Sequence, residues 1–237
     1  MEHVRQCQRS RWQAEPWLIV SVLAVAGLLL IFGFIAGEVM EGSTLAFDHY
    51  VILAFRSAGT PADPLGPPWV QGAARDITAL GSFAVLAIVL SVVVGYLLLS
   101  HKRAAALLVL AAVVGGVAVN DLLKLAFARA RPDFVTSSVK VFTASFPSGH
   151  AAMSAITYLT LAALLARTTP SRRLRLYFVT IGIMLTLLVG VSRVYLGVHY
   201  PTDVLAGWCL GSAWALGCWT VMTRLQRAGQ VEPSKNH

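Results

Sequence analysis

Six long apolar runs restrict what this chain of 237 residues can fold into. They cover residues 17–37, 77–99, 104–127, 148–166, 174–195 and 202–222. A helix needs about 20 apolar residues to cross a bilayer. Backbone polar groups inside lipid must be satisfied within the segment itself, which favours helices. The runs therefore predict an all-α, polytopic membrane helical bundle with six transmembrane helices.

The composition supports a membrane protein and argues against a nucleic-acid partner. Hydrophobic residues make up 57% of the chain and charged residues only 13%, whereas a soluble domain usually carries about 25% charged residues. The net charge of +8 would suit nucleic acid, but the sequence offers no stacking platform or basic helix. The positive charge instead fits loops that orient a membrane protein in the bilayer.

We expect one membrane domain over residues 17–225, between a tail at 1–16 and a polar tail at 226–237. The first run is too long for a signal peptide and no small-residue cleavage site follows it, so we expect it to be retained. The segment 38–76 is rich in Gly and Pro, and residues 43–56 could form a short amphipathic helix. Such a helix would rest on the bilayer surface or gate the substrate.

The basic residues are distributed unequally between the two sides of the predicted bundle. If crossings alternate, one side carries twelve of them, namely Arg5, Arg9, Arg11, Lys102, Arg103, Arg167, Arg172, Arg173, Arg175, Arg224, Arg227 and Lys235. The other side carries seven, namely Arg56, Arg75, Lys124, Arg129, Arg131, Lys140 and Arg193. The positive-inside rule then predicts that both termini are cytoplasmic.

Three polar clusters interrupt the apolar chain, and all fall at the outer ends of predicted crossings. The first ends the third run and contains Lys124, Arg131 and Pro132. Lys124 and Arg131 are seven residues apart, about two helical turns, so both would face one side if the helix continued. Taken alone, the two residues are equally consistent with cations whose side chains snorkel to the lipid headgroups at a membrane edge. Arg129, between them, is expected to contact lipid phosphates or water.

The second cluster, Pro147-Ser148-Gly149-His150, directly precedes an apolar run. The start of a helix offers unpaired backbone N–H groups and the positive end of the helix dipole to an anion. Gly149 allows the backbone to approach a ligand closely. Ser148 is suited to cap the helix or to donate its hydroxyl to a phosphate oxygen. A plain helix cap followed by an interfacial histidine would give the same pattern.

The third cluster contains Ser192, Arg193, His199 and Asp203. His199 and Asp203 are four residues apart, which puts both on one face if helical geometry reaches back to His199. A carboxylate on one imidazole nitrogen fixes the tautomer and leaves the other nitrogen free to attack. Two histidines and an aspartate also suggest a metal site. The nearby cations Lys124 and Arg131 would repel a metal ion and suit phosphate, so we expect no metal and no cofactor.

Together the clusters resemble the type 2 phosphatidic acid phosphatase (PAP2) superfamily, in its branch of bacterial membrane lipid phosphatases. The resemblance rests on KxxxxxxRP at 124–132, PSGH at 147–150 and SRxxxxxHxxxD at 192–203. It implies that His199 is the nucleophile and that Asp203 orients it. It implies that His150 is the general acid. It also implies that five residues hold the phosphate: Lys124, Arg131, Ser148, Gly149 and Arg193.

The resemblance implies a metal-independent enzyme of lipid metabolism that removes a phosphate through a phosphohistidine. Its substrate would be a membrane lipid of the polyprenyl diphosphate, phosphatidylglycerophosphate, phosphatidic acid or lipid A type. We expect it in the bacterial inner membrane with the active site on the periplasmic side. A phosphotransferase, a vanadium haloperoxidase, and a transporter or scaffold are the alternatives, although haloperoxidases are soluble and no catalytic residue is missing. The oligomeric state stays open.

Overall fold

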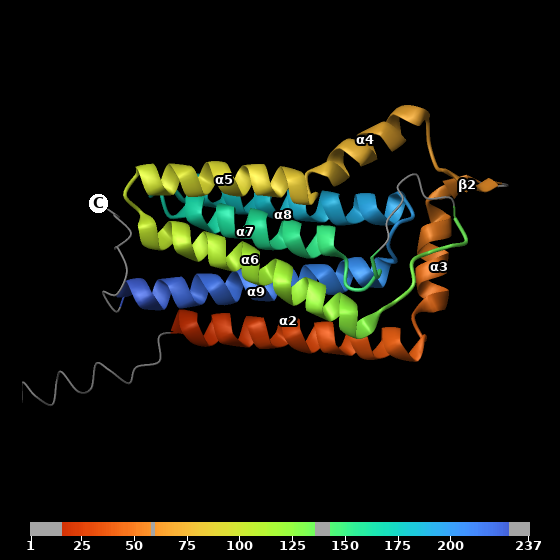
Figure 1. Cartoon of the computed structure of the whole chain (residues 1–237), viewed down its shortest axis with the longest axis horizontal. Coiled ribbons are helices and arrows are strands. Elements are labelled where there is room, and N and C mark those ends of the chain that lie inside the picture. Colours follow the sequence, from red (N-terminus) through yellow and green to blue (C-terminus); the bar gives the residue numbers. More distant parts are fainter. Residues whose placement is uncertain (1–15, 58–59, 136–142, 228–237) are drawn as a thin grey trace, which may run out of the picture.

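The computed structural model describes residues 16–57, 60–135 and 143–227, so residues 1–15 and 228–237 of the two predicted tails lie outside the described part of the chain. Long helices run side by side, a short helix crosses one end of the bundle, and a hairpin projects from that end (Figure 1). The helices are α2 (Pro16–Glu41), α3 (Leu45–Ala54), α4 (Pro68–Ala79), α5 (Phe83–Leu99), α6 (Arg103–Phe127), α7 (Gly149–Ala166), α8 (Arg172–Tyr195) and α9 (Pro201–Arg227). The strands are β1 (Arg56–Ser57) and β2 (Thr60–Pro64).

The predicted all-α membrane bundle is confirmed. In the described part of the chain, five helices are long and apolar enough to cross a membrane: α2, α6, α7, α8 and α9. The bent pair α4 and α5 makes a sixth crossing if the two are counted as one span. The antiparallel hairpin of β1 and β2 is a small addition that the apolar pattern did not predict.

The second predicted crossing, residues 77–99, is not one continuous helix. The chain bends by 46° between α4 and α5. Ser82 begins α5 as its N-cap and accepts the backbone N–H of Val85 at 3.3 Å. Gly81 lies against α8, where a Cβ atom would need to displace the side chain of Val189. A capping serine after a closely packed glycine therefore interrupts a segment that hydropathy alone treats as uniform.

Helix α7 lies inside the bundle and packs against α8 and α9 (Figure 1). Close packing depends on glycines such as Gly207, where an added Cβ would lie 2.7 Å from the backbone oxygen of Ser148. Gly211 lies equally close to the backbone of Ala152. These contacts show that Gly207 and Gly211 serve packing within the chain, as small residues do in membrane bundles.

The two ends of the bundle differ. The first residue of α2 and the last of α9 lie at one end (Figure 1), where Trp17 packs edge-on against Trp219 at 5.7 Å. Helix α3 crosses the opposite end. Its buried side chains are Asp48 and Ile52, while Tyr50 and Phe47 are exposed. Helix α3 is thus fixed to the bundle through a carboxylate as well as through an apolar residue.

Candidate active site

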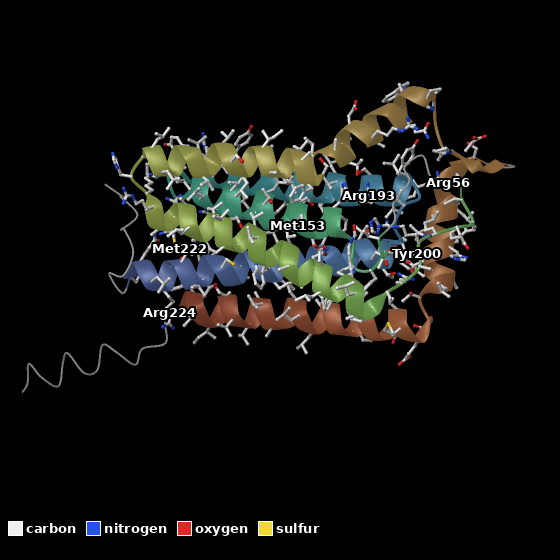
Figure 2. The ribbon with its side chains drawn as sticks, in the orientation of Figure 1. Arg56, Met153, Arg193, Tyr200, Met222 and Arg224 are labelled. Atoms are coloured by element: carbon white, nitrogen blue, oxygen red, sulfur yellow. The ribbon has the colours of Figure 1, made fainter. Side chains whose placement is uncertain are left out.

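The three polar clusters meet at the end of the bundle that α3 crosses. Figure 2 shows Arg193 and Tyr200 at this end, far along the bundle from Met222 and Arg224. The clusters come from the end of α6, the start of α7, and the connection between α8 and α9. The structure therefore brings together the side chains that were singled out in three separate segments of the sequence.

The turn between α8 and α9 positions His199. Helix α9 begins at Pro201, so His199 lies before the helix and the expectation of a shared helical face is wrong. Asp203, at the third helical position, instead accepts the backbone N–H of Tyr200 at 2.9 Å. This is the reciprocal half of a capping box, with an aspartate in the place of the usual glutamate. The capping contact fixes the carboxylate beside the imidazole.

His199 is held from both sides of its ring. Its Nδ1 lies 3.4 Å from Oδ2 of Asp203 and 3.4 Å from Oγ of Ser145, and Ser145 also hydrogen-bonds Asp203. Its Nε2 lies 3.0 Å from Nη1 of Arg131. Burial lowers the pKa of His199 to about 4, although Asp203 opposes this shift. The imidazole is therefore neutral near pH 7, which is the form that attacks an electrophile.

Arg131 approaches His199 from the loop that follows α6. The helix ends at Phe127, and Ala128 adopts a left-handed conformation with φ 45°. Lys124 and Arg131 therefore do not meet along a continuing helix, as the spacing had suggested. They meet at Thr143, whose hydroxyl accepts from Nζ of Lys124 at 3.4 Å and from Nη2 of Arg131 at 3.1 Å. Arg131 also donates to the backbone oxygen of Val198 at 2.6 Å.

The start of α7 faces these cations. Ser148 is the N-cap and is fully buried, and its hydroxyl accepts the backbone N–H of Ala151 at 3.5 Å. A Cβ on Gly149 would lie 3.4 Å from Nζ of Lys124, so glycine leaves room for the amine. His150 is partly exposed, and its imidazole makes no hydrogen bond to any residue that the structure describes. Its ring is thus free to exchange a proton with a ligand or with water.

Arg193 completes the cationic surroundings from the end of α8. It is 3% exposed, and Nη1 donates to Thr78 of α4 at 3.0 Å. Its Nε has no partner within the described residues. The carbonyl oxygen of Asn120, on α6, is likewise buried without a partner. A ligand at this end of the bundle would satisfy groups that the protein leaves unpaired.

Comparison with known proteins identifies the family. The family model of the PAP2 superfamily matches residues 105–227, just over half of the chain. The chain belongs to the PAP2 superfamily. Phosphatidylglycerophosphatase B of Bacillus subtilis is 35% identical over 146 residues, which are 61% of this chain and 71% of that protein. An undecaprenyl-diphosphatase of Sulfolobus acidocaldarius is 38% identical over 101 residues, 40% of this chain and 45% of that protein.

A solved structure agrees with this assignment. The crystal structure of a transmembrane PAP2-type phosphatidylglycerolphosphate phosphatase from Bacillus subtilis superposes with a TM-score of 0.78 at 28% identity. The match covers 86% of this chain and 98% of that one. The resemblance that the three motifs indicated is therefore confirmed for nearly the whole described bundle, including helices outside the matched family model.

Arg129 has a different environment in this PAP2 protein from the one that the sequence suggested. The prediction that it contacts lipid phosphates or water is wrong, because its side chain is only 10% exposed and bridges two buried carboxylates. Nη2 lies 2.8 Å from Oδ2 of Asp48, and Nη1 lies 2.6 Å from Oδ1 of Asp203. Burial disfavours the cation, but the two carboxylates outweigh it and raise the pKa of Arg129.

Asp48 joins α3 to the same network. Besides Arg129 it accepts the backbone N–H of Thr202 at 3.0 Å and the Thr202 hydroxyl at 2.7 Å. Sequence reasoning missed Asp48, Ser145 and Thr143 as neighbours of the site. Asp48 had a signal, since it is the one carboxylate inside the apolar stretch 45–54. Ser145 and Thr143 lie in a loop, where polar residues are common, so neither residue differs from its neighbours as Asp48 does.

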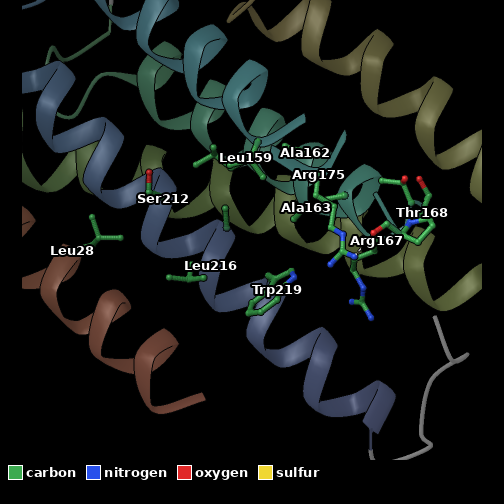
Figure 3. Close-up of a pocket in the computed structure, with 15 residues that line it drawn as sticks. Leu28, Leu159, Ala162, Ala163, Arg167, Thr168, Arg175, Ser212, Leu216 and Trp219 are labelled. Atoms are coloured by element: carbon green, nitrogen blue, oxygen red, sulfur yellow. Dashed lines mark hydrogen bonds between the residues drawn. The ribbon is translucent and has the colours of Figure 1, made fainter. Parts of the chain in front are cut away.

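A large groove lies elsewhere and contains none of these residues. Its volume is about 700 Å³, and it is lined by α2, α7, α8 and α9 together with the connection between α7 and α8. Figure 3 shows Leu28, Leu216 and Trp219 along it, with Arg167 and Arg175 beside them. These residues belong to the end of the bundle remote from His199. The groove lies on a flank that lipid would cover, and the candidate active site is instead the cluster of cationic side chains around His199.

Proposed function

We propose that this PAP2 protein hydrolyses a lipid phosphate or lipid diphosphate through a phosphohistidine on His199. One observation carries the proposal: a buried neutral imidazole has Asp203 on its Nδ1 side and Arg131 3.0 Å from Nε2. Placing the carboxylate on Nδ1 favours the Nδ1–H tautomer and leaves the Nε2 lone pair for attack on phosphorus. The guanidinium is then in position to bind an oxygen of the phosphoryl group.

The proposed reaction has two steps. Nε2 of His199 forms a bond to phosphorus while the bond from phosphorus to the lipid oxygen breaks. His150 gives its proton to that oxygen, and the lipid alcohol or lipid monophosphate departs. Water then attacks the phosphohistidine, His150 takes a proton from the water, and the histidine is regenerated with release of phosphate. General acid–base catalysis of this kind increases the reaction rate by about 10²- to 10⁴-fold.

The cations supply charge stabilisation in the proposed reaction. Lys124, Arg131 and Arg193 approach from three different elements, and Ser148 and Gly149 open α7 beside them. The negative charge spread over the phosphoryl oxygens in the transition state is stabilised by cations fixed before the reaction begins. Within the described residues, no three His, Cys, Asp or Glu side chains cluster as metal ligands would. Metal independence remains a prediction that a chelator tests.

The orientation in the membrane is also part of the proposal. Twelve of the nineteen Lys and Arg residues lie on the side of the termini in the predicted topology. The positive-inside rule then places the pocket on the extracytoplasmic face, which in a bacterial inner membrane is the periplasmic one. The names of the relatives support lipid substrates, since one is a phosphatidylglycerophosphatase and another an undecaprenyl-diphosphatase. The alternative function is a phosphotransferase, in which an acceptor alcohol replaces water.

Purified protein in detergent should release free phosphate from at least one of four lipids: phosphatidic acid, phosphatidylglycerophosphate, a polyprenyl diphosphate and lipid A phosphate. Release should need no acceptor and should continue in EDTA. Phosphate is measured colorimetrically, with heat-inactivated protein as control. Transfer of phosphate only when an acceptor alcohol is added would assign a phosphotransferase instead. Activity that EDTA abolishes and magnesium restores would contradict a metal-free site.

Replacing Asp203 with asparagine should lower kcat by about 10³- to 10⁴-fold, the range seen when a histidine loses the carboxylate that sets its tautomer. The amide keeps the size of the side chain but no longer favours Nδ1–H on His199. The exposed Asp76, on α4, provides the matched control, and Asp76→Asn should keep full activity. A monodisperse Asp203→Asn protein with wild-type kcat would show that the carboxylate does not assist the nucleophile.

A further inference from the structure

Arg56 is a buried cation for which the described residues provide no partner. It begins β1 and is 6% exposed. Its Nε, Nη1 and Nη2 have no hydrogen-bond partner within the described residues, and none of the ion pairs among those residues includes it. Burying a charged group without a counter-charge carries a large desolvation free energy, which destabilises the folded state. An anion beside the guanidinium would offset this cost, and the described residues do not provide one.

The contrast with Arg129 shows that carboxylates of this chain can neutralise a buried guanidinium at this end of the bundle. Arg129 is buried at the same end of the bundle, and two carboxylates, Asp48 and Asp203, hold it. Those carboxylates are fully engaged, because Asp48 also binds Thr202 and Asp203 also binds the backbone of Tyr200. Neither is left over for Arg56. Within the part of the chain that the structure describes, carboxylates thus neutralise Arg129 but not Arg56.

Arg56 lies against the turn that carries the nucleophile. A Cβ on Gly197 would collide with Nη2 of Arg56, so the guanidinium rests on the backbone of this turn. Gly197 also has φ +70°, a conformation that favours glycine. The next residue, Val198, accepts from Arg131, and His199 follows it. Arg56 and Arg131 therefore contact adjacent residues of the turn, immediately before the candidate nucleophile.

The hairpin directs Arg56 to this place. The pairing of β1 with β2 shifts register between Arg56 and Ser57. Irregularities of this kind change the direction of a side chain and are frequent beside active sites. Figure 2 shows that Arg56 and Arg193 lie at the same end of the bundle. The guanidinium of Arg56 thus lies at the end of the bundle that carries the cations proposed to hold the transferred phosphoryl group.

We propose that Arg56 binds a second phosphate group of the substrate, next to the one that is removed. The inference rests on the proposed phosphatase function and narrows its substrate class. A polyprenyl diphosphate carries its second phosphate directly on the first. Phosphatidylglycerophosphate carries it one glycerol away, and phosphatidic acid has none. A guanidinium suits this task because it binds two phosphate oxygens in a planar fork.

The test compares Arg56→Gln with wild type on these three lipids. The variant should lose about 10- to 100-fold in kcat/KM on the lipids with two phosphates, as expected for a hydrogen bond to a charged group. Its kcat/KM on phosphatidic acid should stay within about twofold of wild type. Loss on only one of the two lipids still supports the subsite and identifies the spacing that it accepts. Arg75→Gln, which removes an exposed arginine of α4, is the matched control.

Two outcomes of the comparison on the three lipids would overturn the proposal. An equal loss of kcat/KM on all three lipids would mean that Arg56 supports the catalytic turn. No loss on any lipid would mean that it does not bind the substrate.

A binding measurement keeps the test independent of turnover. Inorganic pyrophosphate should raise the Tm of the wild-type protein more than inorganic phosphate does, and Arg56→Gln should lose this difference. If wild type hydrolyses none of the lipids yet shows the difference, the proposed function fails while the subsite stands. Equal effects of the two anions on wild type would contradict the subsite.

Discussion

Replacing His199 with alanine should reduce phosphate release by about 10⁴-fold or more, because no other group can form the covalent bond to phosphorus. Loss of a nucleophile removes the reaction path itself, whereas loss of a cation only raises its barrier. The side chain lies in a turn that Asp203 fixes through the backbone of Tyr200, and that contact does not involve the imidazole. The variant should therefore still fold and insert. Phosphate release under substrate saturation measures the effect.

His101 provides the control for this substitution. It is exposed in the turn between α5 and α6, at the opposite end of the bundle from His199. Its φ is 56°, so asparagine is the suitable replacement, and His101→Asn should retain full activity. Rapid quenching with radiolabelled lipid should trap a labelled phosphoryl group on wild type and none on His199→Ala. Turnover of His199→Ala within tenfold of wild type would exclude His199 as the nucleophile.

The class of fold was predictable because the bilayer leaves few alternatives. An apolar run long enough to cross must be helical, and five runs correspond to single helices. Hydropathy says nothing about where a helix bends, so the break at Gly81 and Ser82 was missed. That break depends on packing against Val189 of a helix that is distant in sequence. The hairpin that carries Arg56 was missed for a similar reason, since two short strands give too weak an alternating pattern.

Within the candidate site, pairs of residues that are close in sequence could be predicted from their spacing. His199 and Asp203 were paired by their spacing, although a capping contact to Tyr200 joins them rather than a continuous helix. Contacts between segments were not predictable from spacing. Lys124 and Arg131 meet through Thr143, across a loop. Arg129 turns inward because Asp48, 81 residues earlier, supplies a counter-charge. A single sequence does not reveal which distant charges will pair.

Replacing Arg129 with methionine should lower the free energy of unfolding by about 3–5 kcal/mol, the cost of removing one partner from a buried ion pair. Methionine keeps the unbranched apolar part of the arginine side chain but leaves Asp48 and Asp203 without their shared cation. Both carboxylates are completely buried, so water does not replace it. The loss should appear as a lower Tm in detergent. The kcat should fall as well, since Arg129 binds one oxygen of Asp203 while the other faces His199.

A second substitution separates charge from packing in this network. Asp48→Asn in the Arg129→Met background removes one of the two unpaired charges, and an asparagine oxygen can still accept from Thr202. The double variant should therefore regain part of the lost stability, while kcat stays low because Asp203 still lacks its cation. Restoration of Tm without restoration of turnover would show that Arg129 acts on catalysis through Asp203. If Arg129→Met matched wild type in both Tm and kcat, the guanidinium would support neither the fold nor the pairing of Asp203 with His199, and the proposed role of Arg129 would be wrong.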